Sequence, residues 1–182
     1  EIDPSQADTL PSNFPPNLTK IIGEDGSLYY FFDSYAPRVQ ATMDYLKAHT
    51  TAKEGIYAFP FAFRYNFLLN RATPLDFGPV LWAAAAPPAA QTRLVAEMEA
   101  KPPKYIVFNE AENRDFSGVP WSDRFPKVIN FIYQNYHIEQ QIDTHLILRY
   151  GPQPGPDWEI TASPLSTMDN SNLDLMRRIG LA

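Results

Sequence analysis

Residues 94–109 read LVAEMEAKPPKYIVFN, and this stretch decides the fold. Apolar residues recur at helical spacing in its first half, which predicts a helix from Pro88 to about Lys101. Pro102 and Pro103 end that helix, because proline lacks the backbone N–H that another turn would need. The apolar run from Lys104 to Asn109 has the length and composition of a buried strand.

Similar punctuation on both sides of this stretch predicts further elements. The strands are expected at 27–32, 55–60 and 144–150, and the helices at 34–54, 61–70 and 122–136. Ser34 and Ser122 are the candidate caps of the first and last of these helices, and Pro37 lies in the first turn. Helices alternate with strands over short connections, which predicts an α/β domain of three layers around a largely parallel or mixed sheet.

Proline-rich segments set the expected domain boundaries. Residues 1–20 contain four prolines among small polar residues and are typical of an extended lead-in. The α/β domain is expected over 21–151, and a proline-rich C-terminal extension over 152–182. Within that extension we expect a short strand at 158–161 and a helical turn or two at 172–179.

Composition narrows the classes of function. The 182 residues carry a formal charge of −6 without a basic stripe, which argues against a nucleic-acid partner. The chain contains no cysteine and no run of about 18 apolar residues. Because the first residue is Glu1, we expect a processed chain or a segment of a longer protein.

Common catalytic and cofactor motifs are not present in the sequence. There is no glycine-rich phosphate loop and no Gly-x-Ser-x-Gly nucleophile elbow. The three histidines, His49, His137 and His145, are scattered, and His137 is expected at a helix end. We therefore expect no cofactor and no metal site.

A family resemblance centres on residues 55–77. The segment opens with GIYAFP and continues with Tyr65, Leu68, Leu69, Arg71, Pro74 and Phe77. It resembles the soluble C-terminal domain of the multi-spanning bacterial C-type glycosyltransferases and their membrane relatives, which transfer sugars from polyprenyl-phosphate donors. The helix that runs through Lys101 and Pro102 into the strand at 104–109 fits the same pattern, so the resemblance covers about residues 38–109.

The resemblance implies a place and partners for the chain. Such a domain lies on the periplasmic or outer face, tethered to the membrane after the last transmembrane helix. Its expected partners are the transmembrane part of the parent protein and a polyprenyl-phosphate sugar or glycan acceptor. The family's catalytic carboxylate lies in loops of the membrane part, so we expect no catalytic residue in this chain.

Tyr65 and Arg71 are the first candidate ligand-binding residues. A guanidinium makes bidentate contacts with phosphate, and a phenol can meet a sugar hydroxyl. The alternative is structural, because an arginine just past a helix C-terminus can bind the last carbonyls of that helix.

A polar loop after the buried strand holds the other candidates, Asn109, Glu110, Glu112 and Arg114. If the strands at 55–60 and 104–109 are parallel neighbours, this loop and the turn from Pro60 to Arg64 share the edge where ligands bind in α/β sheets. The two carboxylates could serve as acid and base or bind a divalent cation. Alternatively, the loop is solvated and caps the next helix.

Three hypotheses for function follow. The first is an accessory extracytoplasmic domain of a glycosyltransferase-like membrane protein, which supports acceptor or lipid-carrier binding rather than catalysis. The second is a free-standing small α/β enzyme or carbohydrate-binding module with its site at the carboxyl edge of the sheet. The third is a protein-interaction module, which predicts a contiguous exposed apolar patch.

Overall fold

The computed structural model describes residues 17–59, 64–75, 87–109 and 119–151. In chain order the elements are β1 Leu18–Ile22, β2 Leu28–Phe32, α1 Ala36–His49, β3 Ile56–Phe59, α2 Arg64–Leu68, α4 Pro88–Ala100, β4 Tyr105–Asn109, α5 Trp121–Arg124, α6 Pro126–Asn135, β5 Tyr136–Ile142 and β6 His145–Tyr150. The strand and helix expected within 152–182 lie outside the described residues.

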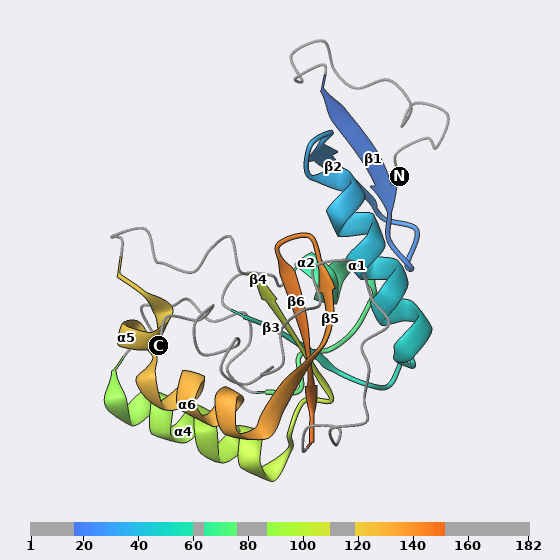
Figure 1. Cartoon of the computed structure of the whole chain (residues 1–182). Coiled ribbons are helices and arrows are strands. Elements are labelled where there is room, and N and C mark those ends of the chain that lie inside the picture. Colours follow the sequence, from blue (N-terminus) through green and yellow to red (C-terminus); the bar gives the residue numbers. More distant parts are fainter. Residues whose placement is uncertain (1–16, 60–63, 76–86, 110–118, 152–182) are drawn as a thin grey trace, which may run out of the picture.

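The central sheet has four strands in the order β3-β4-β6-β5. β3 and β4 are parallel, whereas β6 runs antiparallel to both of its neighbours, β4 and β5. Figure 1 shows α1 on one side of this sheet and α4 with α6 on the other. The prediction of an α/β domain with helices flanking the sheet is confirmed, and the sheet is of the mixed kind.

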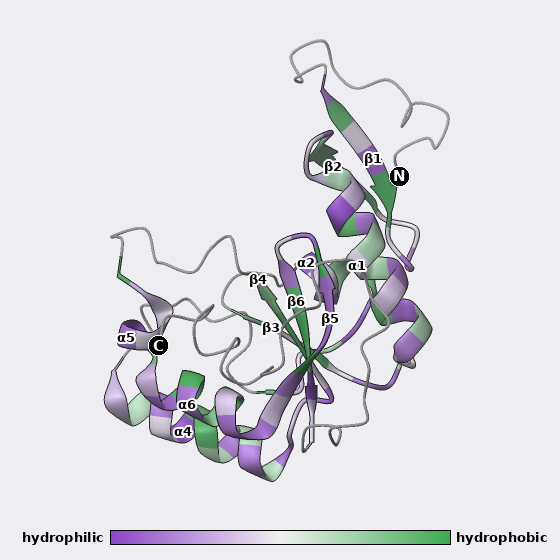
Figure 2. Cartoon of the chain, viewed as in Figure 1, coloured by the Kyte–Doolittle hydropathy of each residue, from purple (hydrophilic) through white to green (hydrophobic). Residues whose placement is uncertain are grey.

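Alternation along the strands divides the core into two parts, one on each face of the sheet. Tyr57 and Phe59 point to the core under α4 and α6, whereas Ile56 and Ala58 point to the core under α1 and α2. β4 alternates in the same way between the two cores. Burial on both faces explains why its sequence is a continuous apolar run, which Figure 2 shows as a mostly green strand.

The hairpin of β1 and β2 forms a second, antiparallel sheet beside α1. Its inner face contributes Ile21 to the core under α1, with Tyr29 and Phe31 packed against it. β1 begins at Leu18, so its first residues lie in the segment that we expected to be an extended lead-in. The prediction for residues 18–20 was wrong because a short strand of mixed polarity carries little periodic signal.

The segment after Phe125 differs most from the prediction. Tyr136 was expected on the apolar face of a helix, but α6 ends at Asn135 and β5 starts directly at Tyr136. His137 therefore lies in a strand rather than at a helix end. Ser122 was expected as a helix cap, but it lies inside α5. No glycine or proline separates helix from strand here, so the sequence has no boundary signal.

A β-bulge in β5 reverses which way its side chains face. Ile138 pairs with Leu148 and Gln140 pairs with Ile147, which leaves Glu139 as the extra residue. Before the bulge Ile138 faces the core under α4 and α6, and after it Ile142 packs on the core under α1. The bulge thereby re-aims part of an edge strand, a common role for this feature.

Two further observations concern the expected boundaries of the helices. α1 is preceded by Tyr35 rather than by the expected cap Ser34, and Tyr35 makes no side-chain capping hydrogen bond. Pro37 lies in its first turn, as expected.

Within the described residues, no helix is both long and apolar enough to cross a membrane.

Candidate anion-binding site

The parallel strands β3 and β4 end at the same edge of the sheet, because their register pairs Phe59 with Phe108. The next residue of β4, Asn109, pairs with His145, the first residue of β6. The β5–β6 turn and α2 lie near this edge (Figure 1). This arrangement meets the condition under which the carboxyl edge of the sheet is the favoured place for a ligand.

Two arginines meet at this edge around the ring of Tyr35. The guanidinium carbon of Arg38 lies 4.4 Å from the ring centroid, and that of Arg64 lies 4.8 Å from it. Arg64 also donates a hydrogen bond to the Tyr35 hydroxyl. Each cation–π contact of a partly exposed arginine contributes about 1 kcal/mol. The ring therefore holds two positive charges in place although they repel each other.

Arg38 also reaches the β5–β6 turn. Its Nε lies 3.1 Å from Oδ2 of Asp143, and one of its Nη atoms donates to the Thr144 hydroxyl. The contact with Asp143 is an ion pair without hydrogen-bond alignment, so the buried Nε–H has no hydrogen-bond acceptor within the described part of the chain. The Arg38 side chain as a whole is 17% exposed.

His145 lies beneath the arginines and is fully buried. Its Nδ1 lies 3.0 Å from the Tyr65 hydroxyl and 3.1 Å from the Thr42 hydroxyl. Its ring is perpendicular to the rings of Tyr35 and Tyr65 in T-shaped contacts. The ring centroids are 6.2 Å apart for Tyr35 and 5.5 Å apart for Tyr65. Among the described residues, its Nε2 has no hydrogen-bond partner.

The charge of His145 follows from this environment. Burial, with the nearby positive charges of Arg38 and Arg64 as the smaller causes, lowers the pKa of its imidazole to about 4. The ring is therefore neutral near pH 7. A hydroxyl can donate to Nδ1 or accept from it. We assign the single proton to Nε2, so that Nδ1 accepts from a hydroxyl and Nε2 is a donor.

Together these groups can bind an anion. Two guanidiniums supply fixed N–H donors that match the oxygens of phosphate or carboxylate. The first turn of α1 adds the positive end of the helix dipole, and that turn contains Arg38 and no acidic residue. A cation at a helix N-terminus is unfavourable unless an anion compensates it. The buried Nε2–H of His145, which has no acceptor among the described residues, likewise costs free energy until an acceptor meets it.

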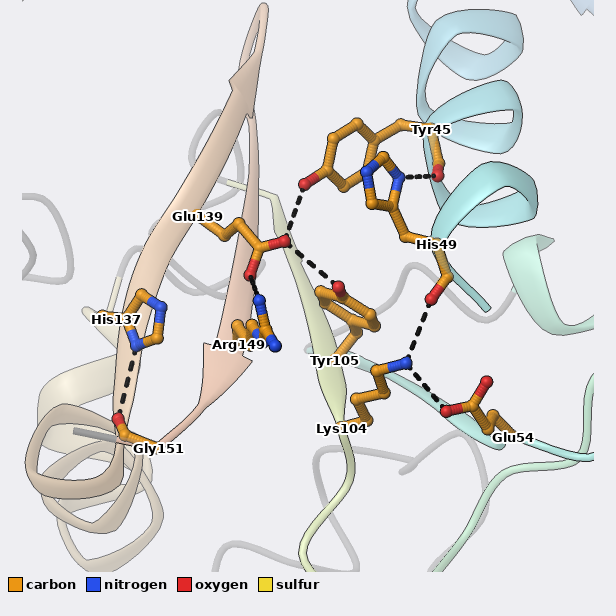
Figure 3. A network of polar contacts seen from close by, with 9 residues as sticks. All are labelled: Tyr45, His49, Glu54, Lys104, Tyr105, His137, Glu139, Arg149 and Gly151. Carbon is orange, nitrogen blue, oxygen red and sulfur yellow. Dashed lines mark hydrogen bonds and ion pairs between the residues drawn. The ribbon is translucent and has the colours of Figure 1, made fainter. Parts of the chain in front are cut away.

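A second polar network lies on the same face of the sheet, nearer to the C-terminal end of α1 (Figure 3). Oε1 of Glu139 accepts hydrogen bonds from Tyr45 at 3.0 Å and Tyr105 at 3.1 Å, and Oε2 accepts one from Arg149 at 3.1 Å. Burial, with the charge of Glu139 second, raises the pKa of Tyr105 to about 12. Both carboxylate oxygens are already used, so this network fastens α1 to the sheet instead of offering a ligand site.

Lys104 extends this network to the loop after α1. Its Nζ lies 2.8 Å from Oε1 of Glu54 and 3.1 Å from the carbonyl oxygen of His49 (Figure 3). The hydrogen bond from Lys104 is the largest cause that lowers the pKa of Glu54 to about 2. The pair is exposed to solvent and its electrostatic contribution to stability is small.

The candidate residues from the sequence divide into three groups. Tyr65 and Asn109 are brought together at His145, the first by its hydroxyl and the second by strand pairing; the side chain of Asn109 is not described. Arg71 is buried elsewhere, where Nη1 lies 2.6 Å from Oε2 of Glu24 and also binds the carbonyl oxygen of Leu69. These contacts match the structural alternative for Arg71. The remaining candidates, Glu110, Glu112 and Arg114, lie outside the described residues.

Most residues that make the site were not singled out from the sequence; the exceptions are Tyr65 and the turn that ends at Arg64. Arg38 and Thr144 are 106 positions apart, and Tyr65 and His145 are 80 apart, so no local spacing connects them. The one available signal was conditional. If the strands at 55–60 and 104–109 are parallel neighbours, the turn from Pro60 to Arg64 lies at the sheet edge where ligands bind.

Neither a metal site nor a comparison with known proteins adds a constraint to this geometry. In the described part of the chain, no group of three histidine or acidic side chains is placed to hold a metal ion. Searches with the chain matched no protein-family model, no curated protein and no solved structure.

Proposed function

We propose that this chain is an accessory extracytoplasmic domain of a membrane-embedded glycosyltransferase-like protein, and that it binds the phosphate of a polyprenyl-phosphate sugar. In this proposal the chemistry takes place in the transmembrane part of the parent protein. The chain holds the carrier or the acceptor close to that part, on the periplasmic or outer face of the membrane.

One observation carries the proposal, namely the convergence of Arg38 and Arg64 on Tyr35 at the carboxyl edge of the parallel strands. Both guanidiniums are held by other contacts before any ligand arrives. A preorganised pair loses little conformational entropy on binding, which favours recognition of a small charged group. The resemblance of residues 38–109 to the glycosyltransferase domains supplies the class of ligand.

The site also offers a donor for an oxygen of the ligand. The Nε2–H of His145 is buried beside the arginines, and no acceptor in the described part of the chain meets it. An uncharged donor next to two cations suits a ligand with an oxygen acceptor beside its phosphate, such as a sugar phosphate. Tyr65 then has a positioning role, because it holds the Nδ1 side of the ring.

Isothermal titration with a short-chain, water-soluble polyprenyl phosphate sugar tests this proposal. We expect saturable binding that weakens about tenfold or more in Arg64→Gln, because a charge-assisted hydrogen bond contributes about 1.5–3 kcal/mol. Arg93→Gln is the matched control, since Arg93 is 65% exposed and lies on α4 on the opposite side of the sheet. Equal binding by wild type and Arg64→Gln would contradict the proposal.

The coding sequence of the parent tests the membrane context. The proposal predicts many hydrophobic segments upstream of Glu1 in the same reading frame. A reading frame that encodes only polar, soluble segments around this chain would contradict the proposed membrane context.

A second candidate function has one observation in its favour. On the outer face of the β1–β2 hairpin, the directly paired residues Ile22 and Leu28 are 55% and 37% exposed, and Phe32 at the far end of β2 is 54% exposed. We propose this face as the contact with the transmembrane part of the parent protein, which is the partner that the resemblance implies. Exposed apolar side chains grouped on one small sheet are typical of an interaction surface.

Copurification of the chain with the separately expressed membrane part tests this contact. Ile22→Ser together with Phe32→Ser is expected to abolish copurification and to leave phosphate binding unchanged. If the variant copurifies as well as the wild type, the hairpin is not the contact.

A further inference from the structure

The turn between β5 and β6 places a carboxylate against Arg38. Ile142 at the end of β5 pairs with His145 at the start of β6, so the turn consists of Asp143 and Thr144 alone. Oδ2 of Asp143 lies 3.1 Å from Nε of Arg38, and the Thr144 hydroxyl accepts a hydrogen bond from Nη1. Both residues of the turn therefore contact the same guanidinium, each at a different nitrogen.

The turn itself does not require a charge at position 143. Asp143 has a backbone φ of 51°, in the left-handed region that favours glycine, asparagine and aspartate in hairpin turns. Glycine or asparagine would adopt this conformation equally well, and neither would bring a negative charge to the turn. The place of the carboxylate against Arg38 accounts for the charge, because there it meets an opposite one.

The contact between Asp143 and Arg38 is one that a ligand can displace. The Asp143 side chain is 58% exposed, and its carboxylate forms an ion pair with Nε without hydrogen-bond alignment. Exposed ion pairs of this kind contribute little to stability. Rotation of the Asp143 side chain into solvent would free Nε, while the Thr144 hydroxyl and the ring of Tyr35, 4.4 Å from the guanidinium carbon, still hold Arg38 in place.

Asp143 occupies the position that an oxyanion would take on Arg38. A guanidinium binds an oxyanion side-on through its Nε–H and a neighbouring Nη–H. Because the Asp143 carboxylate already lies at Nε, it and a phosphate oxygen cannot both take this edge, and their negative charges repel each other. Side-on binding of a phosphate at Arg38 therefore requires Asp143 to leave.

We propose that Asp143 is an autoinhibitory contact, an internal carboxylate that a phosphate ligand must displace from Arg38. The inference rests on the proposed function, because it presumes that Arg38 binds a phosphate, and it adds how access to that arginine is controlled. Anions that gain no more than Asp143 does at Nε are kept out. Thr144 has the opposite effect on binding, because it positions the guanidinium that the ligand needs.

Asp143→Asn and Thr144→Val together test the inference. The first keeps a residue that tolerates the left-handed backbone and removes the charge, and the second removes the acceptor of Arg38 Nη1 with little change in volume. Each chain is titrated calorimetrically with inorganic phosphate and with the short-chain polyprenyl phosphate sugar, in about 150 mM salt to screen distant charges. We expect Asp143→Asn to bind both ligands about fivefold tighter than the wild type, and Thr144→Val to bind them about threefold more weakly.

Glu139→Gln is the matched control, because it removes a carboxylate that pairs with an arginine, Arg149, in the separate network of the same strand. Its affinity for both ligands should equal that of the wild type. If Asp143→Asn binds no more tightly than the wild type, or if Glu139→Gln gains as much, the inference is overturned while the proposed phosphate binding stands.

The remaining outcomes are equally decisive. Tighter binding by Thr144→Val would overturn the inference, because loosening the turn rather than removing the charge would then open the site. Unchanged binding by Thr144→Val would overturn the positioning role of the hydroxyl. Binding by Asp143→Asn without detectable binding by the wild type would support autoinhibition. Failure of both the wild type and Asp143→Asn to bind either ligand would overturn the proposed function together with the inference.

Discussion

The hydroxyl oxygen of Tyr65 lies 3.0 Å from Nδ1 of His145, which joins α2 to the first residue of β6 across a fully buried contact. This contact orients the imidazole so that Nδ1 faces the Tyr65 hydroxyl. The other nitrogen, Nε2, has no hydrogen-bond partner among the described residues. Fold stability and the chemistry of the site thus depend on the same hydroxyl.

Tyr65→Phe removes that hydroxyl and keeps the ring that packs in the core. We expect the free energy of unfolding to fall by about 1 kcal/mol, the net contribution of one buried hydrogen bond. Urea unfolding measures the change. Tyr133→Phe is the control on the opposite face of the sheet, and a loss in Tyr65→Phe no larger than in this control would contradict the role assigned to the hydroxyl.

Stability should depend on pH through His145. Its pKa is lowered from an ordinary value near 6.5 to about 4, mainly by burial. As pH falls below 6.5, the unfolded chain gains a proton at this residue while the folded chain does not. This group therefore removes stability between pH 6.5 and pH 4, by up to about 3 kcal/mol in total, and removes no more below pH 4.

Urea unfolding of the wild type and of His145→Gln over this range measures the effect. The wild type should lose more stability than the variant between the two ends of the range. An NMR titration of the wild-type imidazole gives an independent readout, and a midpoint near 6.5 would show that the ring is not buried as described.

The pair of Arg71 and Glu24 should be one of the strongest polar contributions to stability. Arg71 is nearly buried, and among the described residues its loss would leave the Glu24 carboxylate with only the longer ion pair to Lys47 at 3.6 Å. We expect Arg71→Ala to lower the free energy of unfolding by about 3 kcal/mol. The exposed pair of Arg93 and Glu97 is the matched comparison, and Arg93→Ala should change stability by about 0.5 kcal/mol or less. Equal losses in the two variants would refute the distinction.

Much of the fold could be predicted because its strongest signals are local. α4 and β4 follow directly from apolar spacing and from Pro102 and Pro103. β5 could not be predicted, since Tyr136 follows α6 without a break and the bulge at Glu139 interrupts the alternation that identifies a strand. The motif residue Gly55 has a steric explanation, because a Cβ there would lie 3.0 Å from the carbonyl oxygen of Ala72.

The candidate site was less predictable for a different reason. Its members are Tyr35 just before α1 and residues of α1, α2, the β5–β6 turn and β6. Apart from Tyr65, each looks like an ordinary surface or core residue in its own segment. Arg71, by contrast, stood out beside a helix end, and the structure pairs it with Glu24. Chemical type and local spacing therefore pointed to a structural arginine, and tertiary contacts were needed to find Arg38 and Arg64.

The network around Glu139 predicts a change in the titration of a tyrosine. The pKa of Tyr105 is raised to about 12, first by burial and then by the charge of Glu139 and its hydrogen bond. Glu139→Gln removes the charge, so the alkaline midpoint of Tyr105 should move down toward its ordinary value while the effect of burial persists. Ultraviolet absorbance of tyrosinate against pH measures the shift, with Asp123→Asn as control. An unchanged midpoint would mean that Glu139 does not contact the phenol in solution.

The central claim is that Arg38 and Arg64 bind a phosphate at the carboxyl edge of the sheet. The most direct test is NMR of the ¹⁵N-labelled chain, with the arginine Nε–H and histidine ring signals followed as diethyl phosphate is added. The account predicts that the signals of Arg38, Arg64 and His145 shift together and saturate, while those of Arg71 and Arg149 stay in place. Shifts centred on Arg149, or no saturable shift at Arg38 and Arg64, would contradict it.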